Sequence, residues 1–124
     1  MISVSRSAWR RLFWLCVLAG LVLSLWPEPE HKQAWFPHAD KVQHALAFSV
    51  LVGLGRLAQF ESKRKLFAGL LLLGIGIEAL QSFTATRTAE WADVWADVVG
   101  LLLGFAAAKA IGRRSGREPE VDRR

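Results

Sequence analysis

The sequence contains one cysteine, Cys16, in 124 residues. A lone cysteine excludes a disulfide within the chain and the paired Cys/His spacings of a zinc site. The first apolar segment also lacks the small residues of a signal-peptidase cleavage pattern, because WPEPE (26–30) follows it directly. We therefore expect this segment to stay in the protein as a membrane-spanning helix.

Charge is scarce inside the long apolar segments. Hydrophobic residues make up 52% of the chain, and the charged residues gather in short blocks between these segments, which is typical of membrane proteins. The net charge of +5 does not indicate nucleic-acid binding, since the basic residues stand beside apolar segments and not among aromatic or polar recognition residues. Six tryptophans and no tyrosine, most of them near segment ends, fit aromatic anchoring at a membrane interface.

These patterns predict an all-α fold, a polytopic membrane protein built as a bundle of four transmembrane helices. The expected spans are about 8–26, 41–60, 66–83 and 92–111, although none is an uninterrupted apolar stretch of about 20 residues. ESKRK (61–65) is predicted to be a tight basic turn. The chain is expected to divide into a transmembrane domain over 1–111 and a basic, disordered cytoplasmic tail over 112–124.

The distribution of lysine and arginine predicts the orientation of these spans. Thirteen of them fall on one side of the membrane, and three, Lys32, Lys41 and Arg87, fall on the other. Because positive residues concentrate in cytoplasmic segments, both termini are expected in the cytoplasm and the loops 27–40 and 84–92 outside.

Ionisable residues collect at the outer ends of three expected spans. His44, Glu78 and Asp97 each lie twelve residues from the cytoplasmic end of their helix, counted from Arg56, Leu66 and Lys109. Twelve residues span about 18 Å at the rise of an α-helix, and the hydrocarbon core is about 30 Å thick. We therefore expect the three side chains at one depth, beyond the midplane.

The residues around them leave an excess of negative charge. Asp40, Glu78, Glu90, Asp93 and Asp97 stand against Lys41 and Arg87, which gives a formal charge of −3 with His44 neutral. Such a site within a membrane needs protons, a bound cation or a cationic substrate group, and interhelical hydrogen bonding is the structural alternative. For Asp40, the structural alternative to a role in the site is a helix N-cap. Arg87 is expected either to pair with a carboxylate or to bind an anionic head group.

Small residues recur at every fourth position of the last expected span, at Ala92, Ala96, Gly100, Gly104, Ala108 and Gly112. Such a ridge lets another helix approach closely. The partner is expected to be a helix of the same bundle or of a second copy in a homo-oligomer. The predicted helix-packing residues are Ala96, Gly100, Gly104 and Ala108.

DKVQHALAF (40–48), IEALQSF (77–83), Arg87 and DVWADVVGLLLG (93–104) together resemble the VanZ-like family of small bacterial membrane proteins. The family elements match at Asp40, Lys41, His44, Glu78, Gln81, Arg87, Asp93 and Gly100. Asp97 departs from the pattern, since the family usually has Asn there. The acid keeps the shape of the side chain, removes the amide donors and adds a charge.

The resemblance implies a multi-pass protein of the bacterial cytoplasmic membrane with a role in the cell envelope, because the family's namesake is associated with resistance to the glycopeptide teicoplanin. The first hypothesis is a non-enzymatic protein that binds a lipid or cell-wall head group. The alternatives are a membrane-embedded enzyme acting on a lipid-linked envelope substrate and a small ion- or proton-coupled carrier. The candidate binding residues are Asp40, Lys41, His44, Glu78, Gln81, Arg87, Asp93 and Asp97.

Within this set, the candidate catalytic residues are His44, Glu78, Asp93 and Asp97. A histidine among carboxylates also makes a divalent cation the candidate cofactor, although no ligand spacing such as H-E-x-x-H is present. The sequence does not decide between catalysis and binding.

Overall fold

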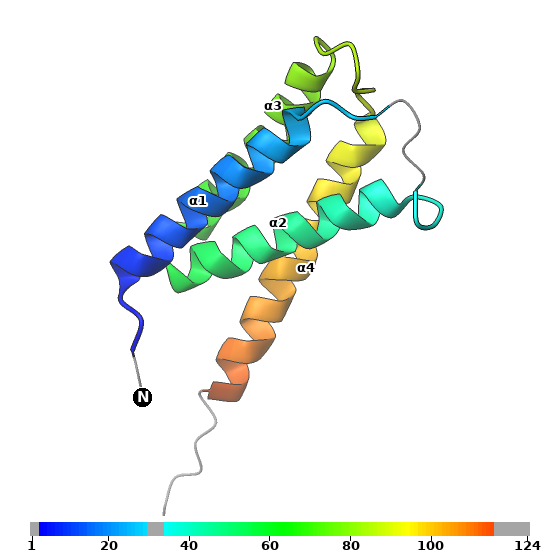
Figure 1. Ribbon diagram of the computed structural model, residues 1–124. Coiled ribbons are helices and arrows are strands. Elements are labelled where there is room, and N and C mark those ends of the chain that lie inside the picture. The colour runs from blue at the N-terminus through cyan, green and yellow to red at the C-terminus, as the bar shows by residue number, and fades with distance from the viewer. Residues whose placement is uncertain (1–2, 30–33, 116–124) are drawn as a thin grey trace, which may run out of the picture.

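The computed structural model describes residues 3–29 and 34–115, and within these ranges the chain forms four α-helices and no strand (Figure 1). The helices are α1 (Arg6–Leu25), α2 (Ala39–Leu57), α3 (Lys63–Gln81) and α4 (Trp91–Ser115). The predicted all-α class is confirmed.

Two of these helices are long and apolar enough to cross a membrane, α1 and the Trp91–Arg113 part of α4. The other two, α2 and α3, have 19 residues each and carry charged residues at both ends. By length and composition, the structure therefore supports a membrane protein with two candidate spans.

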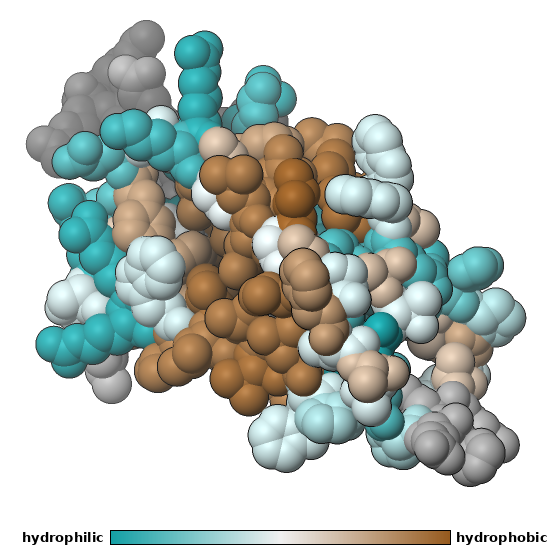
Figure 2. Space-filling model, turned by 90° about the horizontal axis from the view of Figure 1, so that it is seen from above, coloured by the Kyte–Doolittle hydropathy of each residue, from teal (hydrophilic) through white to brown (hydrophobic). Residues whose placement is uncertain are grey.

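The surface of the molecule supports the same interpretation. Figure 2 shows an apolar area in the middle of one face, with hydrophilic residues toward both ends. On α1, the side chains of Trp14, Leu15, Leu18 and Leu23 are between 57% and 67% exposed. An apolar surface of this extent is unusual on a soluble monomer and fits contact with lipid chains.

The connection between α2 and α3 differs from the predicted basic turn. Lys63, Arg64 and Lys65 form the first turn of α3, so only the first part of ESKRK lies outside a helix. The cause is Ser62, whose hydroxyl accepts a hydrogen bond from the Lys65 backbone N–H at 3.2 Å and caps the helix. The predicted turn over 61–65 is therefore wrong in its second half.

The ends of α2 and α4 also differ from prediction. The N-cap position of α2 is His38, with φ of 61°, and Asp40 lies inside the first turn, so the N-cap alternative for Asp40 is wrong. An acid in the first turn still interacts favourably with the helix dipole. At the other end of the chain, 112–115 are helical, and the rest of the predicted tail, 116–124, lies outside the described residues.

Contacts of α1 show which connections between helices lie at each end of the bundle. Near the start of α1, the Arg10 Nε–H donates to the Ala58 carbonyl oxygen at 3.3 Å, and its guanidinium lies 5.5 Å from the centre of the Phe60 ring. Near the end of α1, Arg87 reaches the Leu23 carbonyl oxygen at 3.0 Å. The N-terminus and the basic α2–α3 connection thus lie at one end, and the α3–α4 loop lies at the other (Figure 1).

The helices α2 and α4 cross in close contact at two glycines (Figure 1). A Cβ on Gly100 would collide with the Ala45 carbonyl oxygen and lie 2.8 Å from Ala45 Cα. A Cβ on Gly104 would lie 2.8 Å from Val52 Cβ and 3.0 Å from the Ser49 carbonyl oxygen. At these positions the small-residue ridge therefore packs against a helix of the same chain.

The rest of the ridge is less enclosed. Ala96 and Ala108 are half-buried, and a Cβ on Gly112 would have none of the described atoms within 4 Å. The apolar core packs beside the crossing and contains Phe13, Phe48, Leu51, Val52, Leu66, Leu70 and Leu101. The close crossing of α2 and α4 sets the distance between His44 and Asp97, which lie beside it on the two helices.

Candidate functional site

A polar cluster forms where side chains of three helices meet, at the end of the bundle that contains the α3–α4 loop. Lys41 and His44 belong to α2, Glu78 to α3, and Asp93 and Asp97 to α4. Residues three or four apart share a face of a helix, so α2 and α4 each present two of these groups to the other. The structure thus brings together residues separated by up to 56 positions in the chain, from Lys41 to Asp97.

Lys41 is the centre of an outer group of charges. Its ammonium lies 3.0 Å from Asp40 Oδ2, 2.8 Å from Glu90 Oε2 and 3.3 Å from Asp93 Oδ1. The side chain of Lys41 is only 24% exposed. Because an ammonium has three protons to donate, the three carboxylates satisfy it, and Lys41 serves as their counter-ion.

His44 and Asp97 form the inner part of the cluster. His44 Nδ1 lies 2.8 Å from Asp97 Oδ1, and Asp97 is 1% exposed. On its other side, His44 Nε2 lies 3.9 Å from Asp93 Oδ2, which is too long for a hydrogen bond. The imidazole of α2 is therefore held by one carboxylate of α4 and faces a second one.

Glu78 joins α3 to the start of α4. Its Oε2 accepts a hydrogen bond from the Glu90 backbone N–H at 2.8 Å, just before the first residue of α4. The acid thus lies at the positive end of the α4 dipole. Its other oxygen, Oε1, is buried and has no hydrogen-bond partner among the described residues, and the same holds for Asp97 Oδ2. Unpaired buried acceptors are costly, so the described side chains leave this site incompletely satisfied.

Two candidate binding residues, Gln81 and Arg87, are directed to the end of α1. The Gln81 amide donates to the Ser24 carbonyl oxygen at 2.8 Å. The Arg87 guanidinium donates to the carbonyl oxygens of Leu23 and Trp26, each at 3.0 Å. The last carbonyl groups of a helix have no partner inside it, so these two side chains fasten the C-terminus of α1.

Arg87 also pairs with a carboxylate that the sequence did not single out. Its NH1 group lies 2.7 Å from Glu28 Oε1, in the WPEPE segment after α1. This is the first of the two predicted roles for Arg87. Because Arg87 is engaged there, the cluster and the neighbouring Asp40 and Glu90 together contain five carboxylates and one ammonium, a formal charge of −4 with His44 neutral, where the sequence predicts −3.

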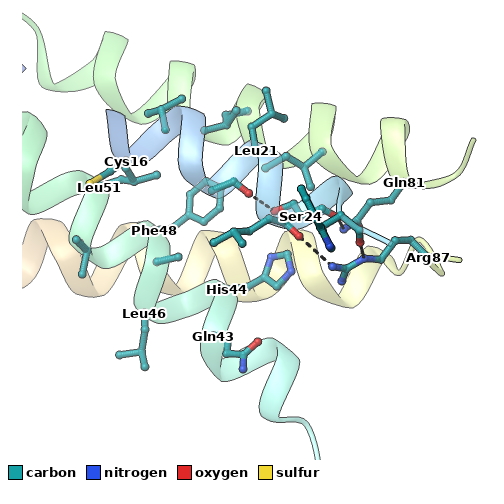
Figure 3. A pocket seen from close by; sticks show the side chains of 18 of the residues that line it. Cys16, Leu21, Ser24, Gln43, His44, Leu46, Phe48, Leu51, Gln81 and Arg87 are labelled. Atoms are coloured by element: carbon teal, nitrogen blue, oxygen red, sulfur yellow. Dashed lines mark hydrogen bonds between the residues drawn. The ribbon is translucent and has the colours of Figure 1, made fainter. Parts of the chain in front are cut away.

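A cavity of about 680 Å³ lies beside the cluster, between α1, α2 and α3. Figure 3 shows Cys16, Leu51 and Phe48 toward one end of it and His44, Gln81 and Arg87 toward the other. The contribution of α1 to this cavity was not predicted from the sequence. Its lining residues, such as Cys16, carry no motif and become neighbours of α2 and α3 only through the packing of the helices.

A second cavity, of about 690 Å³, lies near the basic end of the bundle. Its lining includes Arg10, Trp14, Phe60, Lys65 and Gly69. None of the residues of the polar cluster lines it, so the first cavity is the one that adjoins the candidate site.

Comparison with known proteins agrees with the motifs. The family model VanZ/LLP1 matches residues 3–112, which include all four helices up to the last turn of α4 and every residue of the polar cluster. No curated protein sequence and no solved structure is significantly similar to the chain. Since the family match covers most of the sequence, the chain belongs to the VanZ/LLP1 family.

Proposed function

We propose that this protein is a multi-pass protein of the bacterial cytoplasmic membrane that binds an amphiphilic envelope lipid in the α1–α2–α3 cavity. All four helices cross the membrane in this proposal, with both termini in the cytoplasm and the polar cluster toward the outside. The observation that carries the proposal is the division of the cavity into an apolar end and a polar end at the level of His44.

The cavity fits such a ligand in size and in chemistry. Its volume of about 680 Å³ falls within the range of about 300–1,000 Å³ that is common for small-ligand sites. Leu21, Phe48, Leu51 and other apolar side chains would contact a hydrocarbon chain. The polar head group would form hydrogen bonds with Gln43 and His44, and Gln81 and Arg87 line the same outer end while they hold the end of α1.

The exposed apolar surfaces of α1 and α2 support access from the bilayer. Leu18 and Leu23 on α1, and Leu46 and Val50 on α2, are each at least 57% exposed. A lipid could therefore enter from the side without leaving the apolar phase. The family's association with glycopeptide resistance is consistent with a ligand that belongs to the cell envelope.

Lipid extraction from the purified protein tests this function. The full chain is purified in mild detergent, and the bound lipid is identified by mass spectrometry, which separates phospholipids from isoprenoid-linked precursors. We expect one lipid class enriched over the surrounding membrane. Gly20→Leu should abolish the enrichment, because Gly20 lines the cavity and a Cβ there meets nothing within 4 Å.

Gly69→Leu is the matched control, since Gly69 lines the second cavity and is equally open. This substitution should leave the enriched lipid in place. Loss of enrichment in the control alone, or no enrichment in the unaltered protein, would refute the proposed site.

A membrane-embedded enzyme acting on the same lipid is the second candidate. The observation in its favour is the His44–Asp97 pair, because an imidazole oriented by a carboxylate can act as a general base at the wall of the cavity. Incubation of the protein with its own co-purified lipid, followed by mass spectrometry, should then show a product that His44→Gln does not form.

A further inference from the structure

We propose that His44, Glu78 and Asp93 bind a divalent transition-metal ion of the Zn²⁺ class, and that Asp97 is the positioning residue for His44. The proposal does not rest on lipid binding, although His44 also lines the cavity. It uses one side chain from each of the three helices that form the cluster.

The spacing of the three side chains fits ligands of one ion. One ligand atom from each of His44, Glu78 and Asp93 lies within 4.8 Å of the others. Two ligands at about 2.0–2.2 Å from a tetrahedral Zn²⁺ are about 3.3–3.6 Å apart, and His44 Nε2 and Asp93 Oδ2 are separated by 3.9 Å. Side-chain movements of up to about 1 Å would bring the three ligand atoms to tetrahedral distances.

The His44–Asp97 contact supplies the orientation that a metal-binding histidine needs. An ionised carboxylate only accepts hydrogen bonds, so Asp97 Oδ1 at 2.8 Å places the proton on His44 Nδ1. The lone pair of the neutral imidazole is then on Nε2, the nitrogen that faces Asp93. Metal-binding histidines usually donate their second N–H to a carboxylate or carbonyl in this way.

Buried oxygens without partners are the independent sign of a ligand here. Glu78 is 4% exposed, and its Oε1 has no hydrogen-bond partner in the part of the chain that the structure describes. Among the side chains within 3–29 and 34–115, no lysine or arginine forms an ion pair with Glu78 or Asp97. A divalent cation would satisfy Glu78 and offset the excess negative charge of the cluster.

The outer group of carboxylates provides a comparison within the same protein. Asp40, Glu90 and Asp93 also lie close enough together to hold an ion. Lys41 Nζ lies within 3.3 Å of all three, so that group has its own cation. The inner group has a histidine in the corresponding place, which can be a ligand as well as a proton carrier.

The ligand set favours Zn²⁺ or a similar transition metal over Ca²⁺ and Mg²⁺. Calcium and magnesium prefer sites made only of oxygen, whereas an imidazole ligand suits zinc, iron, copper and nickel. Asp93 belongs to both groups: its Oδ1 lies 3.3 Å from Lys41 Nζ, and its Oδ2 faces His44 Nε2 at 3.9 Å.

Titration of the purified full chain with ZnCl₂ tests the site. In metal-free buffer and detergent, calorimetry should show saturable binding of one Zn²⁺ per chain. Glu78→Gln and His44→Ala should abolish this binding, because each removes a ligand. Asp97→Ala should weaken it by about 10–100-fold, as is typical when a partner of a metal-binding histidine is lost.

Glu90→Gln is the matched control, since Glu90 pairs with Lys41 and is not in the inner group. It should leave zinc binding unchanged. X-ray absorption of the zinc-loaded protein gives a second measurement that needs no variant, and it should show an imidazole ligand. No saturable binding, binding that survives Glu78→Gln and His44→Ala, or a coordination shell without imidazole would each overturn the proposal.

Discussion

His44 Nδ1 and Asp97 Oδ1 lie 2.8 Å apart and join α2 to α4 in the buried part of the polar cluster. The family usually has Asn at the position of Asp97, and an Asn carbonyl oxygen could accept the same hydrogen bond from Nδ1. The acid therefore preserves the contact and adds a negative charge beside the imidazole. The difference between the two side chains lies mainly in charge.

Asp97→Asn should be tolerated in the folded protein. The substitution keeps an acceptor for His44 and replaces a buried charge with a neutral amide, which is cheaper to bury. The free energy of unfolding in detergent should stay equal or rise. Asp97→Ala removes the acceptor and should lower the free energy of unfolding by about 1–3 kcal/mol. Equal losses for Asn and Ala would show that the charge itself is required.

Gly74→Ala should destabilise the protein through the same aspartate. A Cβ on Gly74 would collide with Asp97 Oδ2 and lie 3.3 Å from Phe48 Cζ, so α3 could not approach the cluster as closely. We expect a loss of about 1–3 kcal/mol, typical of overpacking. Gly76 lies on the same helix, and a Cβ there would meet no described atom within 4 Å. Gly76→Ala should therefore be neutral or stabilising by up to about 1 kcal/mol. Thermal unfolding of both variants measures the difference.

Gly100→Ala should separate α2 from α4. The colliding atoms are the backbone of Ala45, which cannot turn aside like a side chain. The result should be a lower thermal midpoint and, because the crossing positions the cluster, weaker zinc binding. Gly112 lies on the same helix, and a Cβ there would have no described atom within 4 Å, so Gly112→Ala should change neither property. An unchanged midpoint in Gly100→Ala would contradict the close crossing.

Arg87→Ala should act on stability, because Arg87 holds the C-terminus of α1. The variant loses donors to Leu23 and Trp26 and the ion pair with Glu28. We expect a loss of about 1–3 kcal/mol, in the range for charged hydrogen bonds. Lys109→Ala removes an exposed cation from α4 and serves as the control. Normal stability with lost lipid enrichment would instead favour a direct contact of Arg87 with a head group.

Lys41→Met should leave three neighbouring carboxylates without their counter-ion. Because Lys41, Asp40 and Glu90 are partly exposed, we expect a modest loss of stability, about 1 kcal/mol or less. The loss should shrink at high salt, since added ions screen exposed like charges. The free energy of unfolding of both proteins, measured at low and high NaCl, tests this expectation. A loss of stability that does not depend on salt would indicate lost packing of the Lys41 side chain instead.

Much of the fold was predictable because it depends on local patterns. Apolar segments separated by charged blocks located the four helices, and helical spacing placed Lys41 and His44, and Asp93 and Asp97, on shared faces. The boundaries failed where a single capping contact decided them, as at Ser62, which draws three basic residues into α3. Ser62 is the one residue of a preferred N-cap type in 58–66, so the sequence carried this signal, and the prediction of a turn overlooked it.

The candidate site was predictable only in part. Equal depth on three helices places His44, Glu78 and Asp97 in one set by counting residues alone. The contacts of Gln81 and Arg87 were not predictable, because their partners are backbone carbonyls of α1 and a glutamate between two prolines. Neither partner carries a pattern that distinguishes it in the sequence.

The helical class and the residues available for chemistry follow from the sequence, since they depend on composition, periodicity and spacing. The membership in the VanZ/LLP1 family follows from the match of the sequence to the family model. Tertiary packing alone determines which charges neutralise one another. Lys41 pairs with the outer carboxylates and Arg87 binds the end of α1, so Glu78 has one oxygen without a partner among residues 3–29 and 34–115. An ion pair depends on distances of a few ångströms between helices, and those distances are set by how Gly100 and Gly104 allow α2 and α4 to pack.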